Sequence, residues 1–369
     1  MANTRETLGE QATLDGLVQD TLVDFEEDGI TSLPQYGIYR KSTLQNLTLP
    51  SVTSLANGSI SYCSNLQKID LSGSQTVAIN SGALSTGNQN LNALILRSTA
   101  MSTMSSTGGL ANTKIAIDEG AVYVPTNLVA TYKANANWKQ YFIADIADYP
   151  VTNFETISDS WADIFEAEDD GTYLSKYAIG DTKTIDLGTE GTLLMEIVAF
   201  DQDDLADESG KAHITWISKR LLNTKHNMNS SSTTSGGWAS SSMRTYLRET
   251  IKPLIPTVVR NRIKEVTKIS ATYENSAIVV DGQTTTDDVW IPSNHEIFNV
   301  TTYESTGAVY SSKFTDASSR IKYDSTATAT YWWLRSASSG TYFRIVYGGG
   351  TANDNIASRS YGVALGFCT

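Results

Sequence analysis

The chain has 369 residues, enough for two domains that each bury a core, so we expect a domain boundary near the middle. Charged residues make up only 18% of the chain, while Ser, Thr, Asn and Gly are abundant, which favours strands and loops over helices and is less typical of a metabolic enzyme. The formal net charge of −13 opposes binding to nucleic acid or to an anionic lipid surface, so we predict no nucleic-acid partner.

The N-terminal segment, residues 1–28, predicts a helical cap or a tether to an assembly. Its apolar residues follow helical spacing at Leu14, Leu17, Val18, Leu22 and Phe25. Acidic residues and a glycine between Asp24 and Gly29 end this pattern. The start of the chain lacks the apolar core of a secretory signal peptide, and no stretch approaches the roughly 20 apolar residues of a membrane span. We therefore predict neither a signal peptide nor membrane insertion.

A repeat follows over residues 29–148. The pattern Leu-x-x-Leu-x-Leu, with Ile in the second place of one copy, begins at Leu44, Leu66 and Leu91, so the copies lie 22 and 25 residues apart. Each copy predicts one short strand, and coils of this size bury their apolar face only by stacking on one another. We predict a leucine-rich-repeat β-solenoid. Together with Ser61–Leu66 and the closing Val122–Val129, it resembles the BspA-like class, and we favour a scaffold role over ligand binding.

Residues 149–172 predict a solvated linker. The segment contains Pro150 and the acidic run Glu166–Gly171, which is too charged for a core and too short for a fold. The linker would separate the repeat domain from a second domain over residues 173–369.

The second domain predicts mainly strands with two helices. Strands are expected at 179–188, 193–200, 213–217, 289–293 and 331–336. The first helix begins at a Ser241 or Ser242 cap and ends before Pro253, and the second begins at Pro256 with Val259, Ile263 and Val266 facing inward. The predicted fold class is therefore α+β, mainly β.

The most specific motif lies at the end of the chain, where Trp332–Ser336 precedes a Gly-, Ser- and Asn-rich stretch and then Tyr361–Cys368. It is accompanied by Met228-Asn229, Gly237-Trp238, Ser242–Leu247 and Ile291–Glu296. This set resembles C-type-lectin-fold proteins of gut phages and their clostridial hosts. Many members are variable proteins of diversity-generating retroelements, in which adenine-directed mutagenesis rewrites the final segment. The chain departs from the family at Ala364–Cys368, where a proline is frequent.

The resemblance implies a C-type-lectin-like domain over residues 173–369 with a hypervariable ligand-binding surface. The implied partner is a host-cell surface protein or glycan, and the implied location is a phage tail or a bacterial cell surface. A homotrimer is compatible with a tail-tip protein, although no heptad pattern supports it. Two alternatives remain open: a structural virion or cell-surface protein without variable binding, and, third, a carbohydrate-active enzyme.

The composition of residues 338–360 independently favours a binding surface, because small polar and aromatic residues predominate as they do in antibody loops. The predicted ligand-binding residues are Ser338, Thr341, Tyr342, Arg344, Ile345, Tyr347, Thr351, Asn353, Asp354, Asn355, Ile356, Arg359 and Ser360. Our hypothesis is that the aromatic and charged members form one patch. A hairpin that only closes the sheet is the alternative. Trp332, Trp333 and Leu334 are assigned to the core, with Arg335 as a buried ion-pair partner.

No catalytic residue is predicted. Sulfatase-activating oxidases of the same fold need a reactive cysteine pair, and the second domain contains only Cys368. The acid pairs Asp203-Asp204 and Asp287-Asp288 are adjacent in sequence, which points their carboxylates apart, so we interpret both as solvated loop tips and not as glycosidase carboxylates.

No metal and no cofactor are predicted either. Asn294–Phe298 lacks the second histidine of a zinc-protease helix, so His295 is interpreted as structural. The pair Asn353-Asp354 supplies only half of a lectin calcium site, and calcium binding through Asp354 remains an open alternative. Cys63 and Cys368 lie in different predicted domains and are interpreted as buried thiols.

Overall fold

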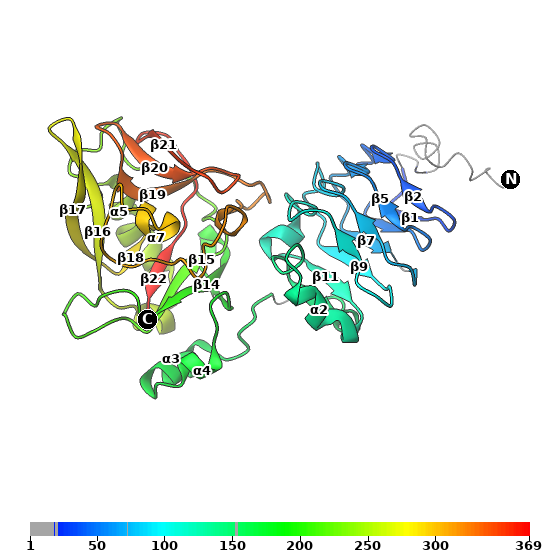
Figure 1. The fold of residues 1–369 in the computed structure, drawn as a ribbon, viewed down its shortest axis with the longest axis horizontal. Helices are drawn as coiled ribbons and strands as arrows, with labels where there is room; N and C mark the ends of the chain where they lie inside the picture. The colour runs from blue at the N-terminus through cyan, green and yellow to red at the C-terminus, as the bar shows by residue number, and fades with distance from the viewer. Residues whose placement is uncertain (1–17, 19–20, 72, 152–153) are drawn as a thin grey trace. The chain divides into compact units, whose positions relative to one another are not determined.

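The computed structural model describes residues 18, 21–71, 73–151 and 154–369. These residues form two compact units. The first runs to Phe154 and includes Thr326–Thr328, and the second comprises Glu155–Ser325 and Ala329–Thr369. Strands predominate in the ribbon and the helices are short (Figure 1). The prediction of a mixed α/β chain that consists mainly of strands is confirmed.

Parallel strands build the first unit. Within its described residues, one sheet contains β1 (Asp24–Glu26), β4 (Asn46–Thr48), β7 (Lys68–Leu71), β9 (Ala93–Leu96), β11 (Ala121–Val124) and β12 (Ile143–Asp145). A second sheet contains β2 (Ser32–Leu33), β5 (Ser54–Leu55), β8 (Ala78–Ile79) and β10 (Thr103–Met104), and β3 (Ile38–Tyr39) pairs with β6 (Ile60–Ser61). The short helices are η2 (Lys114–Ile117), η3 (Thr126–Leu128), α2 (Val129–Ala134) and η4 (Ile146–Asp148).

The pairing register of this unit follows the spacing of the leucine pattern. Leu47 pairs with Ile69, 22 residues later, and Ile69 pairs with Leu94, 25 residues later. The leucines of all three copies are at most 1% exposed and share one core. Each coil therefore buries its apolar face against its neighbours, as the repeat predicts.

The predicted N-terminal helix falls largely outside the described residues, because residues 1–17, 19 and 20 are not among them. Its last part differs from the prediction, since Asp24–Glu26 form the strand β1. This strand pairs in parallel with β4, with Phe25 opposite Leu47. Pairing with the edge of a sheet satisfies backbone groups that would otherwise be left open, and this outweighs the helical pattern.

The predicted solvated linker over 149–172 is wrong from residue 155 onward. Trp161–Asp169 form the helix α3, which Ser160 begins with a capping box to Asp163. Helical spacing buries Ile164, Phe165 and Ala167 in the core of the second unit and leaves most of the acidic run exposed. The second short helix, α4, spans Tyr173–Lys176.

One member of the acidic run, Glu168, is buried by α3. Its carboxylate accepts a hydrogen bond from the Thr369 hydroxyl at 2.6 Å. Burial raises the pKa of Glu168 to about 7, because this hydrogen bond and the nearby cations do not offset the loss of water.

The Glu168 pKa predicts a pH dependence of stability. The pKa of Glu168 is higher in the folded state than in the unfolded chain. The buried neutral carboxyl group therefore makes its full contribution to the free energy of unfolding below pH 4.5, and this contribution is lost as pH rises toward 7. By pH 7 the loss should reach about 3 kcal/mol. The E168Q variant cannot ionise and should not show this loss. Urea unfolding between pH 4 and pH 7.5 measures the difference, and equal slopes for both proteins would contradict the prediction.

The second unit is built around an antiparallel sheet. Its order is β13 (Thr182–Asp186), β14 (Thr192–Phe200), β15 (Ile214–Ser218), β22 (Gly366–Cys368) and β18 (Val289–Trp290). The hairpin of β16 (Val266–Glu274) and β17 (Ala277–Asp287) and a sheet of β19 (Trp332–Ala337), β20 (Tyr342–Val346) and β21 (Ala352–Ile356) complete the strands (Figure 1). The helices are α5 (Ser242–Tyr246), α6 (Thr257–Arg260) and α7 (Asn294–Phe298), with η5 (Gly188–Glu190), η6 (Leu247–Ile251), η7 (Lys252–Leu254) and η8 (Ser318–Arg320).

The first of the two predicted helices extends as far as the sequence suggests, through α5, η6 and η7, and the second is shorter. The first has the predicted Ser241 cap but continues beyond Tyr246 as a π turn. The second ends at Arg260, and Val266 is the first residue of β16 instead of a helical core residue. A long hairpin with β17 takes precedence over the helical spacing, because it pairs eight of the nine β16 residues with β17. No helix in the described part of the chain is long and apolar enough to cross a membrane.

Candidate functional site

The strand β19 forms a buried frame beneath the predicted binding segment. Trp332, Trp333 and Leu334 are fully buried, as predicted. The Trp332 indole N–H donates to the Arg320 carbonyl, and that of Trp333 donates to the His226 carbonyl. These bonds fix two large side chains in one orientation, so the strand is a rigid support for its neighbour β20.

Arg335 anchors this frame through a buried ion pair, which confirms its predicted structural role. Its two terminal nitrogens donate to the Glu296 carboxylate at 2.6 and 2.7 Å. Lys268 contributes a third charge-assisted bond to Glu296 and also pairs with the buried Asp203. Burial alone would raise the Glu296 pKa, but the Arg335 and Lys268 cations outweigh it and lower that pKa to about 2.

The hairpin of β20 and β21 carries most of the predicted binding residues. Its register places Arg344 opposite Asp354, and Ile345 opposite Asn353. Because paired residues of an antiparallel sheet share a face and successive residues alternate, the hairpin has two different sides. Even-numbered residues of β20 point to one side and odd-numbered residues to the other.

The even-numbered side bears Tyr342 and Arg344. The Arg344 guanidinium lies 4.8 Å from the ring centroid of Tyr303 and donates to the Asn294 side chain at 3.2 Å. Asp354 accepts a hydrogen bond from the Ser338 hydroxyl at 3.1 Å. The two charged residues on this side are therefore engaged by neighbouring side chains of the chain itself.

The odd-numbered side continues from the buried Phe343 and Ile345 to an edge where three tyrosine rings meet. Tyr331 lies 4.7 Å from Tyr347 and 5.5 Å from Tyr361, measured between ring centroids. We define the tyrosine face as Tyr331, Tyr347, Asn353, Asn355, Arg359 and Tyr361. Tyr361 packs against the buried Trp333 at 5.1 Å. Each tyrosine is thus braced by another ring.

Polar groups complete the tyrosine face. The Asn355 side chain and the Arg359 cation both lie close enough to Tyr361 to lower its pKa. Burial raises the pKa of the Tyr361 hydroxyl, and these two neighbours offset part of the increase. The hydroxyl therefore stays protonated at neutral pH and can donate a hydrogen bond.

The structure places the predicted residues in three groups. Exposed residues are Thr341, Tyr342, Thr351, Arg359 and Ser360. Partly buried residues are Ser338, Arg344, Tyr347, Asn353, Asp354, Asn355 and Ile356. Ile345 is fully buried, so its prediction as a ligand contact is wrong: it pairs with Trp333 in the core, where alternation along β20 directs its side chain.

The hypothesis of a single patch is also wrong. Tyr342 and Arg344 lie on the opposite side of the hairpin from Tyr347, Asn353 and Asn355. Two residues of the tyrosine face, Tyr331 and Tyr361, are absent from the predicted set. Tyr331 immediately precedes the Trp332–Ser336 motif and Tyr361 is the first residue of the Tyr361–Cys368 motif, and these positions are the signal that could have identified them.

The acid pairs differ from their prediction as solvated loop tips. Asp203 and Asp287 are each 1% exposed. Asp203 pairs with Lys268 and accepts from Thr215, and Asp287 accepts from Trp238 and pairs with Arg244. Because these carboxylates are committed to structural partners, neither is positioned to work as a glycosidase acid or base.

The two cysteines and His295 lie in structural positions. Cys63 and Cys368 are both buried, in the cores of the first and second units respectively, as predicted. Burial raises the pKa of the Cys368 thiol well above its usual value, which disfavours the nucleophilic thiolate. His295 is buried and its Nδ1 lies 3.0 Å from the Val300 carbonyl, which confirms its structural interpretation.

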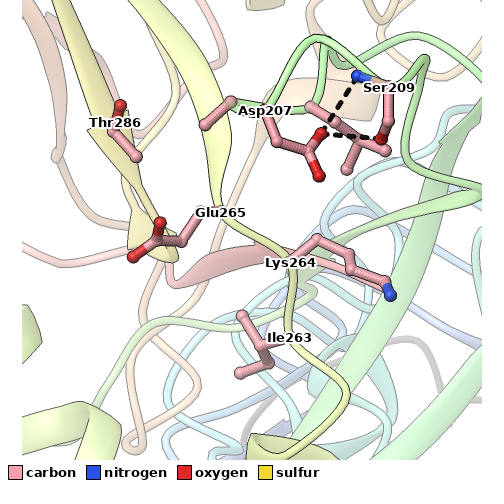
Figure 2. A pocket seen from close by; sticks show the side chains of 8 residues that line it. Asp207, Ser209, Ile263, Lys264, Glu265 and Thr286 are labelled. Atoms are coloured by element: carbon pink, nitrogen blue, oxygen red, sulfur yellow. Dashed lines mark hydrogen bonds between the residues drawn. The ribbon is translucent and has the colours of Figure 1, made fainter.

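A pocket of about 490 Å³ lies away from the predicted site. Its lining residues are Leu205, Ala206, Asp207, Ser209, Ile263, Lys264, Glu265 and Thr286. Figure 2 shows the Asp207 carboxylate accepting hydrogen bonds from Ser209, while the side chains of Lys264 and Glu265 extend in different directions. The charged groups of this pocket do not converge on one point, as a catalytic site requires. Across the described residues, no group of three His, Cys, Asp or Glu side chains is arranged to hold a metal.

Comparison with known proteins adds one similarity. A family profile described as "Domain of unknown function (DUF6273)" matches residues 209–368. The match begins just before β15 and ends at the last residue of β22, so it includes the frame, the hairpin and the tyrosine face. No curated protein and no solved structure matches the chain.

Proposed function

We propose that the chain is a non-enzymatic binding protein whose C-terminal unit is a C-type-lectin-like domain with a variable contact surface on the tyrosine face. The first unit serves as a leucine-rich β-solenoid scaffold. The partner is a protein or glycan on a host-cell surface. The chain itself is located on a phage tail or on a bacterial cell surface.

One observation carries this proposal: a fully buried frame lies in one sheet with the polar outer strand β21. Residues Trp332–Ala337 are all buried, whereas β21 beyond the neighbouring strand contains no fully buried residue. Side chains that do not contribute to a core can change without loss of the fold, so sequence variation would be tolerated at the exposed and partly buried hairpin positions and not in the frame or at the buried β20 residues.

The residues of the tyrosine face suit recognition of varied partners. Tyrosine supplies a broad contact area and loses little conformational entropy on binding, while asparagine offers both donors and acceptors. The rings of Tyr331, Tyr347 and Tyr361 already contact one another, so less order must be gained when a ligand binds.

The retroelement part of the proposal has a direct genetic test. The neighbouring genes should encode a reverse transcriptase and include a near-copy of the segment for residues 338–360. Related isolates should differ at adenine-containing codons for exposed hairpin positions and agree at Trp332–Ser336. Isolates whose differences fall equally in the frame and in the hairpin would favour a structural role without variable binding.

The binding surface predicts different effects for two tyrosines of β20 and its turn. Replacing Tyr347 with alanine should weaken binding about 30-fold, or about 2 kcal/mol, because it removes an aromatic contact from the tyrosine face. Tyr342→Ala is the matched control, since Tyr342 is 37% exposed on the opposite side, and should change affinity less than threefold.

The measurement is calorimetric titration with a partner isolated by panning against host-cell surface extracts. Melting curves of both variants serve as the folding control. A large loss for Tyr342→Ala together with an unchanged Tyr347→Ala would place the contact surface on the other side of the hairpin.

A further inference from the structure

Three tyrosines and an arginine form a cluster on the first unit, around the pair β3 and β6. The ring centroids of Tyr36 and Tyr39 are 5.0 Å apart, and those of Tyr39 and Tyr62 are 5.5 Å apart. The Arg40 guanidinium lies 5.0 Å from the Tyr39 ring centroid and 5.9 Å from that of Tyr62. We call Tyr36, Tyr39, Arg40 and Tyr62 the aromatic cluster.

The backbone is strained at three of these four residues. Tyr36, Arg40 and Tyr62 have φ angles of 58°, 56° and 59°, in the left-handed region that side chains disfavour. Glycine occupies the equivalent turn positions of later coils. Gly58 and Gly82 are equivalent to Tyr36, and Gly87 is equivalent to Tyr62, each with a positive φ angle. Glycine would form these turns without strain, so the turn itself does not explain the tyrosines.

One of these glycines makes room for a tyrosine of the cluster. A Cβ atom at Gly87 would lie 2.6 Å from the Tyr62 Cα and 2.9 Å from its ring, whereas one at Gly58 would make only an ordinary contact with the Tyr36 ring, at 3.9 Å. The rings therefore rest on the backbone of the next coil and leave much of their surface in solvent, with Tyr36 39% and Tyr62 47% exposed. Strain that maintains exposed side chains, instead of a core, indicates a functional surface.

The charge of the aromatic cluster indicates an anionic ligand. Arg40 is exposed, and among the described residues no carboxylate forms an ion pair with it. Within the described part of the chain its contacts are with the two tyrosine rings, which leave its N–H donors open. A guanidinium in this setting can bind a carboxylate through two parallel hydrogen bonds.

The backbone beneath the cluster is already engaged. The amides of Tyr36, Ile38 and Arg40 donate to the carbonyls of Gly58, Ser59 and Ser61. These bonds hold β3 in register with β6 beneath the rings. The exposed ring surfaces and the guanidinium are the groups that can contact a ligand, and together they suit one with an apolar C–H face and an acidic group.

We propose that the aromatic cluster binds acidic saccharides. The exposed tyrosine rings would stack on the C–H face of a sugar, and Arg40 would pair with its carboxylate. This site belongs to the first unit and is independent of the tyrosine face of the second unit, so either could fail without the other.

The test uses the full chain and a trisaccharide of galacturonic acid, with the trisaccharide of galactose as the neutral probe. Calorimetric titration should show binding of the acidic probe at least tenfold tighter than that of the neutral one. Arg40→Gln should remove this preference. Tyr62→Gly should weaken binding at least tenfold, while scanning calorimetry should show an unchanged or raised melting temperature because the strained turn is relieved. Tyr149→Ala, at an exposed tyrosine outside the cluster, is the matched control and should bind as the wild type does.

Three results would overturn the proposal. The first is equal binding of the two trisaccharides, or binding of neither. The second is binding of a polyglutamate peptide without binding of the acidic saccharide, which would assign the surface to acidic peptides. The third is a clear fall in melting temperature for Tyr62→Gly, since that would make the tyrosine a packing residue.

Discussion

Replacing Arg335 with methionine is expected to lower the free energy of unfolding of the second unit by about 3–5 kcal/mol. The substitution leaves the Glu296 carboxylate with one of its two cationic partners, in a site that water does not reach. It also removes donors from the carbonyls of Ile291 and Ile269. Each buried acceptor left without a partner adds to the loss, because no water replaces the bond.

Arg344→Met is the matched control for this prediction. Arg344 lies only nine residues away, is partly exposed, and has one hydrogen bond to a side chain. Its replacement should cost less than about 1 kcal/mol. Urea unfolding followed by tryptophan fluorescence measures both variants. Similar losses at the two positions would mean that the buried network contributes no more than a surface contact.

Lys322 should make the second unit more stable as pH rises above 7. Its side chain is buried and donates to the Ser218 carbonyl. Burial lowers the pKa of Lys322 to about 7, and the nearby Glu196 offsets only part of this effect. Above pH 7 the folded chain releases a proton that the unfolded chain retains until about pH 10.5, so stability increases across that interval.

The expected gain is about 3 kcal/mol between pH 7 and pH 9.5, and about 4–5 kcal/mol over the whole interval. Lys322→Met cannot ionise and should show no such rise. Lys322→Arg should fall progressively below the wild type in stability as pH rises above 7, since a guanidinium does not lose its proton in this range. The readout is the urea midpoint at half-unit pH steps. If the methionine variant rises as steeply as the wild type, another group is responsible.

The elements that the sequence predicts well are those with a strong local pattern. The leucine spacing of 22 and 25 residues predicts the strand pairing, because a stacked coil repeats its register. The apolar run at Trp332–Leu334 predicts a buried strand, because few other structures bury three consecutive large side chains.

The rest depends on contacts between distant parts of the chain. The division of the binding residues into two sides is set by the turn at Tyr347–Gly350, which determines whether Asn353 faces Ile345 or Arg344. Tyr361 reaches the tyrosine face through a bridge with His226, more than a hundred residues earlier. The burial of Asp203 with Lys268 could not be predicted from the sequence either, because a charged residue is expected in solvent unless its partner is known.

The position of β22 has a consequence for synthesis of the chain. This strand lies between β15 and β18, so residues 366–368 form an inner strand of the main sheet of the second unit. Translation proceeds toward the C-terminus, and the sheet cannot close until these residues leave the ribosome. The hairpin of β20 and β21 is made just before them. A reading-frame shift within the hairpin codons would therefore remove the inner strand as well, and only changes that preserve the frame can yield a folded unit.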